Sequence, residues 1–406
     1  MTRVLVTGAS GFVGSRLVVP LLERGFEVRC LARTPSKLDA ASWRGSVDVA
    51  HGDVGGDLAE ALDGVDVAVY LVHSIGQGTG WADTERTHAA NFARAAAVAH
   101  VRRIVFLGGL GHDDDALSEH LRARHDVGRL LASSGVEVVE LRAGVIVGGG
   151  SASFEMLRKL VEVLPVMVTP KWVETRCQPI AITDVVELLV RAVATTTLAP
   201  GVYDAGGPDV VTYSEMMATF ADVAGLPRRW LVRVPLLTTR LSSLWIGLVT
   251  PLPVPLAREL VESLVNEVVV TGPSACEALS VEPLGLRAAM RRALEATGPA
   301  TQHPSGGTVD AFSSLPTDPP WSGTTVLGDR RTARTSAPPE DVFAALERIG
   351  GSTAWYGARW LWWARGLLDR LVGGPGLRRG RSAALVEGDA VDFWRIEVLD
   401  PPRRLR

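Results

Sequence analysis

A glycine-rich loop at the start of the chain constrains the fold more than any other feature. The apolar run Arg3–Thr7 predicts a strand, and it leads into Gly8, Gly11 and Gly14 at G-x-x-G-x-x-G spacing before a helix-like stretch. In such a unit the first glycine permits a tight turn, the second lets a pyrophosphate approach the backbone, and the third lets helix and strand pack closely. Free N–H groups at the helix start then hold the phosphates. The loop predicts a dinucleotide site; a tight turn without a ligand is the alternative.

Strand-like and helix-like stretches alternate from residue 3 to about residue 147. Strands are predicted at Arg3–Thr7, Glu27–Ala32, Val47–Ala50, Val65–Val72, Arg103–Leu107 and Val136–Arg142. Helices are predicted at Gly14–Arg24, Leu58–Leu62, Thr84–Ala99 and Leu117–Ser133. Alternation at this spacing is typical of βαβ units whose parallel sheet is covered on both faces. We therefore predict an α/β fold with a doubly wound parallel sheet of the Rossmann type.

Length and composition divide the chain into four parts. A chain of 406 residues is too long for one ordinary domain, and 47% hydrophobic with 21% charged residues is typical of a globular protein with a large core. We predict a dinucleotide-binding core in residues 1–150 and a smaller substrate lobe in 151–295. A linker rich in Pro, Gly, Ser and Thr follows in 296–328, and a partial α+β segment in 329–406. Helices predicted in the lobe are Phe154–Val163, Asp184–Thr195 and Tyr213–Ala224, the last capped by Thr212 or Ser214.

Selectivity between the two pyridine dinucleotides should depend on the end of the second strand. An NAD-selective site places a carboxylate there for the ribose 2′-hydroxyl. This chain instead has Arg33, with Lys37 nearby, and a guanidinium is a forked, permanently charged group suited to a 2′-phosphate. We therefore predict that NADP(H) is preferred over NAD(H), with an ordinary solvated charge at Arg33 as the alternative. Asp53 and Val54, after the third strand, are placed to meet the adenine ring or to form a simple loop turn.

The complete predicted cofactor site draws on four strand ends and one helix. It consists of Thr7, Gly8, Ser10, Gly11, Phe12, Val13, Gly14, Arg33, Lys37, Asp53, Val54, Val72, His73 and Arg124. His73 and Ser74 end the fourth strand on the nicotinamide side, where a capped loop is the alternative. The run His112–Asp115, with two further histidines nearby, fits no standard metal spacing, so we expect a solvated acidic loop and no metal site.

Several stretches resemble the NAD(P)H-binding atypical members of the extended short-chain dehydrogenase/reductase family. This group includes NmrA-like regulators and the 39-kDa-type accessory subunit of respiratory complex I. The resembling stretches, which span roughly residues 1–290, are Val4–Gly14, Leu31–Arg33, Gly52–Val54, Asn91–Ala96, Arg103–Gly109, Arg142–Gly144 and Pro179–Val185. The resemblance implies an extended reductase fold with a bound NAD(P)H, but none of these motifs fixes a substrate.

The catalytic residues that the resemblance implies are replaced. Reducing members use a tyrosine as acid, a lysine four residues on and a serine that orients the substrate carbonyl, because hydride transfer needs a proton donor beside the developing alkoxide. In the matching frame this chain has His120 and Arg124, and Gly108 and Gly109 stand where the serine would be. Two interpretations stay open. His120 replaces the tyrosine, since its ordinary pKa is near neutrality, and Arg124 binds the ribose; or the catalytic set is lost and the nucleotide is structural or sensed.

The C-terminal segment is rich in tryptophan. It contains five of the eleven in the chain, namely Trp355, Trp360, Trp362, Trp363 and Trp394. A helix is predicted from Pro338-Pro339 to Ile349, and a strand over Val391–Val398. The segment resembles the beginning of an SRPBCC-type helix-grip domain and looks truncated. The resemblance implies an apolar ligand between sheet and helix; tryptophans that only complete a core, or a helix face that touches lipid, are the alternatives.

Charge and cysteine content exclude several classes of protein. A net charge of −3 gives no electrostatic reason to bind nucleic acid or acidic membranes. Cys30, Cys177 and Cys276 form neither a disulfide framework nor a metal motif. No cleavable leader is recognisable, and the apolar run Leu241–Ala257 is short for a membrane span and interrupted by prolines. We expect a cytoplasmic protein whose membrane contact is at most peripheral, and the use of arginine over lysine indicates a bacterial source.

These observations predict an NADP(H)-binding, oxidoreductase-like protein. Its substrate would be a quinone or another hydrophobic carbonyl, since the apolar stretch Trp230–Leu264 and the tryptophan-rich segment both favour an apolar ligand. The alternative is a non-catalytic NAD(P)H-binding redox sensor, or an assembly or regulatory protein. The expected partners are the dinucleotide and a hydrophobic small molecule, and the sequence does not fix an oligomeric state.

Overall fold

The computed structural model divides into two compact units. One is formed by Met1–Leu244 with Pro253–Thr308, and the other by Trp245–Leu252 with Val309–Arg406. The structure describes residues 2–73, 80–111, 117–164, 166–233, 262–296, 332, 334–348, 361, 390–391, 394–396 and 398–405. Several predicted features therefore lie almost entirely outside the described residues. They are the linker 296–328, the apolar run Leu241–Ala257, Ser74, the acidic loop His112–Asp115 and four of the five C-terminal tryptophans.

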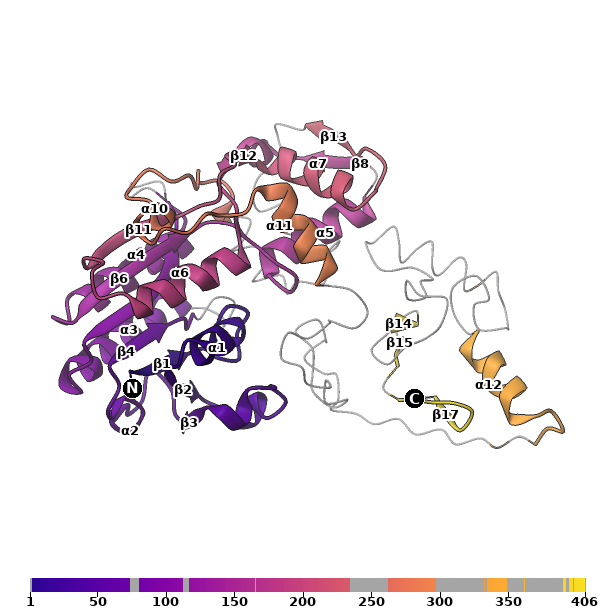
Figure 1. Cartoon of the computed structure of the whole chain (residues 1–406). Helices are drawn as coiled ribbons and strands as arrows, with labels where there is room; N and C mark the ends of the chain where they lie inside the picture. The colour runs from indigo at the N-terminus through magenta and orange to yellow at the C-terminus, as the bar shows by residue number, and fades with distance from the viewer. Residues whose placement is uncertain are drawn as a thin grey trace. The chain divides into compact units, whose positions relative to one another are not determined.

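A seven-stranded parallel sheet forms the centre of the first unit (Figure 1). Its strands are β1 (Arg3–Thr7), β2 (Glu27–Ala32), β3 (Asp48–His51), β4 (Val67–Tyr70), β5 (Arg103–Gly109), β6 (Glu137–Ala143) and β11 (Gly201–Ala205). They lie in the order β11-β6-β5-β4-β1-β2-β3, and every neighbouring pair is parallel. The order reverses beside β1, and ligands of open α/β sheets bind at the carboxyl ends of the strands at such a point. The predicted doubly wound Rossmann sheet is confirmed.

Helices cover both faces of this sheet. They are α1 (Gly14–Glu23), α3 (Trp81–Val98), α4 (Glu119–Ala132) and α6 (Ile182–Ala194), with the short α2 (Ala59–Leu62) beyond β3. Side chains alternate between the two faces of a strand. Val4 and Val6 of β1 accordingly share a core with α1 and α6, whereas Leu5 belongs to a second core with α3 and α4. The predicted elements are thus present, with ends that differ by a few residues.

A smaller lobe follows β6. Its helices are α5 (Ala152–Val163), α7 (Tyr213–Val223), α10 (Ala275–Ala278) and α11 (Leu286–Glu295). The lobe also contains three short strand pairs. They are β7 (Ile146–Val147) with β10 (Ile180–Ala181), β9 (Arg176–Cys177) with β12 (Val211–Thr212), and β8 (Val166–Thr169) with β13 (Trp230–Arg233). A single-turn helix occurs in the lobe at Lys171–Glu174, and two more lie between β2 and β3, at Pro35–Leu38 and Arg44–Ser46. Of the two predicted caps of α7, Thr212 is the one used, in a reciprocal capping box with Glu215.

The second unit has a helix and two hairpins among its described residues. Helix α12 (Pro339–Glu347) begins at a proline, as predicted. The prediction of one strand over Val391–Val398 is wrong, because β14 (Ala390–Val391) pairs antiparallel with β15 (Trp394–Arg395). Strand propensity depends on side-chain type and does not reveal where the chain reverses. A further hairpin joins β16 (Leu399–Asp400) to β17 (Arg404–Leu405).

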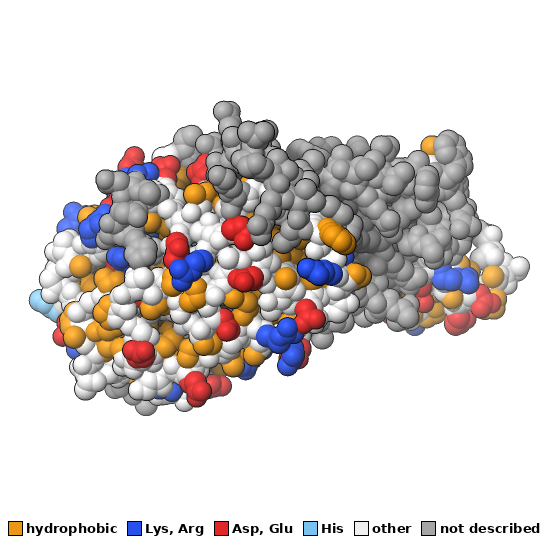
Figure 2. All heavy atoms as spheres, turned by 90° about the horizontal axis from the view of Figure 1, so that it is seen from above, with side chains coloured by type: hydrophobic (Ala, Val, Ile, Leu, Met, Phe, Trp, Pro, Cys, Tyr) orange, Lys and Arg blue, Asp and Glu red, His pale blue; other side chains and the backbone are white. Residues whose placement is uncertain are grey.

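The surface carries no concentration of one charge on the face seen in Figure 2. Arginine and lysine side chains are interspersed there with aspartate and glutamate over the described residues. Within the described ranges, no helix has the length and hydropathy needed to cross a membrane.

The loop between β1 and α1 is held by a close approach of two glycines. Gly8 has a φ of +72°, in the left-handed region that favours glycine. A Cβ atom on Gly14 would lie 2.2 Å from the Gly8 carbonyl oxygen and 2.9 Å from the Ala9 Cα. The first turn of α1 can therefore pack against the end of β1 only because Gly14 has no side chain.

Replacement of Gly14 by alanine should destabilise the first unit. Because the clash involves backbone atoms, we expect Gly14→Ala to lower the free energy of unfolding by roughly 1–3 kcal/mol, despite the better helix propensity of alanine. Denaturant titration of the full chain measures this. Gly45→Ala is the matched control, because a Cβ there meets nothing within 4 Å; equal unfolding midpoints for the two variants would contradict the packing explanation.

Candidate dinucleotide-binding site

The predicted phosphate loop lies at the carboxyl end of β1, where the strand order reverses. Thr7 is buried, and its hydroxyl donates to the Val69 carbonyl (3.1 Å) and accepts from the Leu71 N–H (3.0 Å). It thereby joins the ends of β1 and β4. The Gly11 N–H donates to the Gly8 carbonyl (2.9 Å) and closes the turn, while Ser10 and Gly11 are exposed. Thr7 thus anchors the start of the loop to β4, and the exposed Ser10 and Gly11 are the part of the loop that a ligand can reach.

Arg16 holds the other side of this loop and was not among the predicted site residues. Its two terminal nitrogens donate to the carbonyls of Phe12 (2.7 Å) and Gly149 (2.8 Å), and its guanidinium carbon lies 4.3 Å from the centre of the Phe12 ring. Arg16 lies in the first turn of α1 and Phe12 two residues before the helix, so the chain entering α1 brings the two side chains together. The contact with Gly149 arises from tertiary structure and has no local signal in the sequence.

The candidate 2′-phosphate site lies at the adjacent ends of β2 and β3. Arg33 directly follows β2, and its side chain is 66% exposed. The Arg33 Nε lies 3.4 Å from the Asp53 Oδ2, which places a carboxylate beside the guanidinium. Lys37 lies in the single-turn helix Pro35–Leu38 and is exposed. An ion pair therefore stands at this edge, with an exposed lysine in the single-turn helix that follows β2.

The loop that follows β3 is fastened to α3. The Asp53 Oδ1 accepts the Gly55 N–H (2.8 Å), and the Asn91 side-chain amide donates to the carbonyls of Val54 (2.9 Å) and Gly56 (2.8 Å). The Val54 side chain is 3% exposed and belongs to the core, so any contact of Val54 with adenine would come from its backbone. Asn91 was noted only as part of a resembling stretch, although its two bonds give this loop its shape.

Arg124, predicted to contact the cofactor, is buried under the ends of β4 and β5. Its guanidinium donates to the carbonyls of Val72 (3.2 Å) and Leu107, and its central carbon lies 4.8 Å from the centre of the Phe106 ring. The Glu85 carboxylate, from α3, lies 3.9 Å away. Arg124 thus uses its donors to hold two strand ends together. Val72 and His73 follow β4 at this place, with His73 exposed.

Helix α4 packs closely against Gly109, near the position where the resemblance implies a catalytic serine. Gly109 accepts a hydrogen bond at its carbonyl from the His125 Nε2 (3.0 Å), and a Cβ on Gly109 would lie 2.8 Å from the Leu121 Cδ2. A Cβ on Gly108 would lie 2.7 Å from the Glu140 Oε1. A side chain at either position would require these neighbours to shift, so the two glycines have a packing reason.

Glu140 is the side chain that would have to shift if Gly108 were larger. This carboxylate is 4% exposed and accepts from the Arg142 Nε (2.7 Å). A Cβ on Gly128 of α4 would lie 2.1 Å from its other oxygen. Gly108 and Gly128 together leave room for one buried ion pair between β5, β6 and α4, and a buried charge needs such a partner.

His120, the predicted proton donor, lies in the first turn of α4 beside Trp81, with ring centres 6.2 Å apart. Its Nδ1 is buried and has no hydrogen-bond partner within the described part of the chain. Burial, followed by the charges of Arg124 and His73, lowers the pKa of His120 to about 3. The imidazole is therefore uncharged at neutral pH. It can offer or accept a hydrogen bond, but it does not hold the extra proton that an imidazolium acid would deliver.

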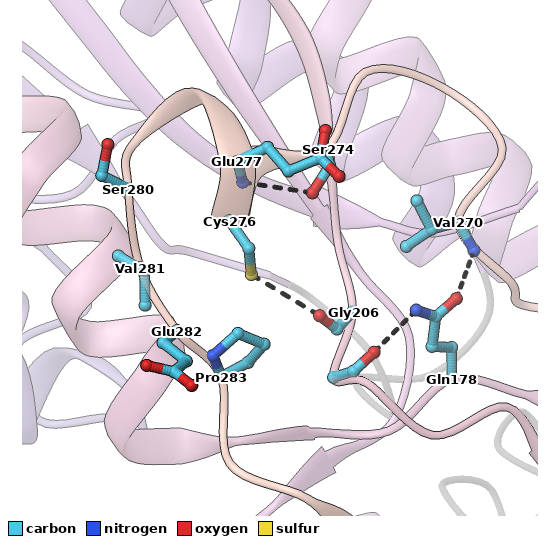
Figure 3. Close-up of a pocket in the computed structure, with 11 residues that line it drawn as sticks. Gln178, Gly206, Val270, Ser274, Cys276, Glu277, Ser280, Val281, Glu282 and Pro283 are labelled. Atoms are coloured by element: carbon cyan, nitrogen blue, oxygen red, sulfur yellow. Dashed lines mark hydrogen bonds between the residues drawn. The ribbon is translucent and has the colours of Figure 1, made fainter.

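A separate pocket of about 540 Å³ opens at the end of β11 (Figure 3). Most of the polar groups in its wall already have partners. The Gln178 amide donates to the Gly207 carbonyl (2.7 Å) and accepts from the Val270 N–H (2.9 Å), and the Cys276 thiol lies 3.5 Å from the Gly206 carbonyl. Burial raises the pKa of Cys276 to about 11, so this thiol is a poor nucleophile. These groups fasten the segment around α10 to the sheet.

Comparison with known families assigns the glycine loop and the sheet around it. Residues 8–163 match a family described as NAD(P)H-binding. These residues thus resemble an NAD(P)H-binding domain in sequence as well as in fold. Residues 321–405 match a second family, described as a protein of unknown function (DUF2867). A distinct C-terminal family segment is thus present, while its helix-grip character stays a prediction.

Relatives and solved structures agree with this assignment. A 3-beta-hydroxysteroid dehydrogenase of Mycolicibacterium neoaurum is 42% identical over 93 residues, which are 22% of this chain and 25% of that protein. A nucleoside-diphosphate-sugar epimerase of Staphylococcus aureus covers 72% of this chain and 100% of its own at 16% identity, with a TM-score of 0.58. The NADPH-dependent quinone oxidoreductase QOR2 of Escherichia coli, complexed with NADPH, covers 71% and 98% at 20% identity, with a TM-score of 0.57. The resemblance to atypical short-chain dehydrogenase/reductase proteins is confirmed in domain and fold. The chain spans about a quarter of the length of the curated relatives it matches.

The described residues contain no group of three or more His, Cys, Asp or Glu side chains that could hold a metal ion. The acidic run that begins at His112 falls outside them.

A carboxylate in the phosphate loop should abolish dinucleotide binding without unfolding the chain. Gly11 is exposed, and a Cβ there would meet only the Gly8 carbonyl, at 3.1 Å. We expect Gly11→Asp to weaken NADPH binding at least a hundredfold, because it repels the diphosphate and removes charge-assisted N–H bonds worth about 1.5–3 kcal/mol each. Calorimetric titration measures the affinity, with Gly45→Asp as a control that adds the same charge elsewhere. Equal affinities in both variants would place the cofactor outside this loop.

Proposed function

We propose that this protein binds NADP(H) and reduces a quinone or another hydrophobic carbonyl by hydride transfer, without a Ser-Tyr-Lys set. The observation that carries the proposal is the packing of Gly108 and Gly109 against Glu140 and α4 beside an open glycine loop. The glycine loop would hold the cofactor, while two glycines stand where a serine would activate an ordinary ketone. A quinone fits this combination because its reduced oxygen is a stabilised phenolate that solvent can protonate.

Each predicted site residue has a role in this proposal. The loop from Thr7 to Gly14 holds the diphosphate, Arg33 and Lys37 hold the 2′-phosphate, and Asp53 and Val54 border the adenine. Val72, His73 and Arg124 form the wall on the nicotinamide side, and Arg124 acts there by fixing the Val72 carbonyl. The bound cofactor would supply the hydride. His120, uncharged beside Trp81, would orient the acceptor oxygen by a hydrogen bond.

Two similarities support the substrate class. QOR2 of Escherichia coli is an NADPH-dependent quinone oxidoreductase with the same fold, and the Mycolicibacterium relative is a dehydrogenase of a steroid, another apolar molecule. We further propose a bacterial source, which the use of arginine over lysine supports, and a cytoplasmic location. The tryptophan-rich C-terminal segment would bind the apolar ligand in a helix-grip fold.

A non-catalytic redox sensor or assembly protein is the second candidate. The glycines in place of a serine and the buried Arg124 also favour this second candidate. Neither Gly108–Gly109 nor Arg124 would be available to bind the oxygen of a ketone. A sensor would distinguish NADPH from NADP⁺ by affinity and would show no turnover. Cofactor oxidation therefore separates the two candidates.

Turnover with quinones tests the proposed reaction. We expect NADPH oxidation by a panel of benzoquinones and naphthoquinones above the background without enzyme, with His120→Ala lowering kcat about two- to tenfold, the worth of one neutral hydrogen bond. Because the pKa of His120 is about 3, the ring stays neutral from pH 5 to 8, and the rate should show no inflection from this residue in that range. A rate that rises as the pH falls through about 6.5, and loses this rise in His120→Ala, would instead assign the proton to an imidazolium. Absence of any oxidation would reject the enzyme in favour of the sensor.

The cofactor preference is tested at Arg33. We expect Arg33→Ala to weaken NADPH binding about tenfold to a hundredfold, since a charge-assisted bond to phosphate contributes roughly 1.5–3 kcal/mol. NADH binding should hardly change, because NADH has no 2′-phosphate. Fluorescence titration with both nucleotides gives the two dissociation constants. Parallel losses for NADPH and NADH would show that Arg33 is not the selective group.

A further inference from the structure

The ends of β2 and β3 bring opposite charges together where the adenine-side ribose would lie. Arg33 and Asp53 both follow strand ends, and register pairing of Ala32 with His51 makes those ends neighbours. From the sequence alone, Arg33 is expected to meet the 2′-phosphate and Asp53 the adenine, as independent groups. Their contact couples them, so the charge that a 2′-phosphate would meet is that of a pair.

We propose that Asp53 is a specificity-determining residue that weakens the preference for NADP(H) by partly neutralising Arg33. This inference rests on the proposed binding of NADP(H) at Arg33. Removal of the Asp53 charge would leave the guanidinium with its full positive charge and would increase the selectivity for the phosphorylated dinucleotide.

The geometry of the pair indicates the direction of the effect. The Arg33 Nε and Asp53 Oδ2 are 3.4 Å apart, beyond the roughly 3.2 Å limit of a good N–H···O bond, and the contact is an ion pair without hydrogen-bond geometry. Asp53 therefore does not lock the guanidinium in a fixed orientation that would help it to grasp a phosphate. Its influence on Arg33 is one of charge, and a nearby carboxylate also repels a phosphate dianion.

The two oxygens of Asp53 have different functions, which makes a clean substitution available. Oδ1 accepts the Gly55 N–H (2.8 Å) and shapes the loop, while Oδ2 faces Arg33. The His88 Nε2 also faces the Oδ1, at 3.9 Å. Asparagine retains an oxygen for the Gly55 N–H and removes the charge. Asp53→Asn should therefore keep the turn and change the electrostatics alone.

The size of the effect follows from exposure. The Arg33 side chain is 66% exposed and that of Asp53 is 35% exposed, so water screens the pair. Exposed ion pairs of this kind have modest strength. We expect Asp53→Asn to raise the ratio of the dissociation constant of NADH to that of NADPH about two- to fivefold. Both nucleotides carry the same adenine, so any change at the adenine contact cancels in this ratio.

A double-mutant cycle tests the coupling on the full chain. The ratio of the two dissociation constants is measured by fluorescence titration for the native chain, Arg33→Ala, Asp53→Asn and the double variant. If Asp53 acts mainly through Arg33, its substitution raises the ratio in the native background and raises it clearly less in the Arg33→Ala background. Asp48→Asn is the control, since the Asp48 Oδ2 lies 2.6 Å from the Arg29 Nε at the opposite ends of the same two strands. It should leave the ratio unchanged.

The outcomes separate this inference from the function on which it rests. If Arg33→Ala leaves the ratio unchanged, the proposed preference for NADP(H) fails. If Arg33→Ala lowers the ratio but Asp53→Asn leaves it unchanged or lowers it, the preference stands and the role of Asp53 is overturned. An equal rise in both backgrounds would overturn the coupling as well, because Asp53 would then act on the phosphate directly.

Discussion

The architecture of the site depends on one close contact, the approach of Gly14 to the Gly8 carbonyl. Because nothing projects from Gly14, α1 can begin immediately beside the end of β1. Thr7 then joins β1 to β4 through two hydrogen bonds to its hydroxyl, and Arg16 joins the first turn of α1 to Gly149. A diphosphate binds best where exposed backbone N–H groups are held rigidly, and these contacts supply the rigidity from both sides of the loop.

The opposite wall of the site is governed by how closely α4 packs on β5. Gly108, Gly109 and Gly128 allow the approach, and His125 and Arg124 complete it by donating to main-chain carbonyls of β5. The same close packing brings Glu140 and Leu121 against Gly108 and Gly109, so a serine side chain there would require these neighbours to shift. The two glycines and the tight packing of α4 are thus linked, and this link underlies the proposal of a quinone-like acceptor.

The sequence predicted the sheet and its phosphate loop because those features depend on local chemistry. Strand periodicity, glycine spacing and the start of α12 at Pro339 all act within a few residues. The functions of Arg16 and Asn91 could not be predicted in this way, because they bond to Gly149 and Gly56, which come from other elements. The same holds for Glu140, which lies against Gly128 of α4. The divided strand at Val391 was missed for the same reason, since β-propensity says nothing about where a chain turns back.

Arg33 and Arg124 show how far residue type alone can lead. Both were assigned to the cofactor because both are permanent cations at suitable positions. Arg33 follows β2, the neighbour of the edge strand β3, and stays mostly exposed. Arg124 lies on the inner face of α4, where a buried carbonyl without a hydrogen-bond partner would be costly. Its donors are therefore used by Val72 and Leu107 before a ligand arrives. The buried Arg124 therefore shapes the site through the main-chain carbonyls that it binds. The exposed Arg33 acts on a ligand through its charge, which the neighbouring carboxylate of Asp53 partly neutralises.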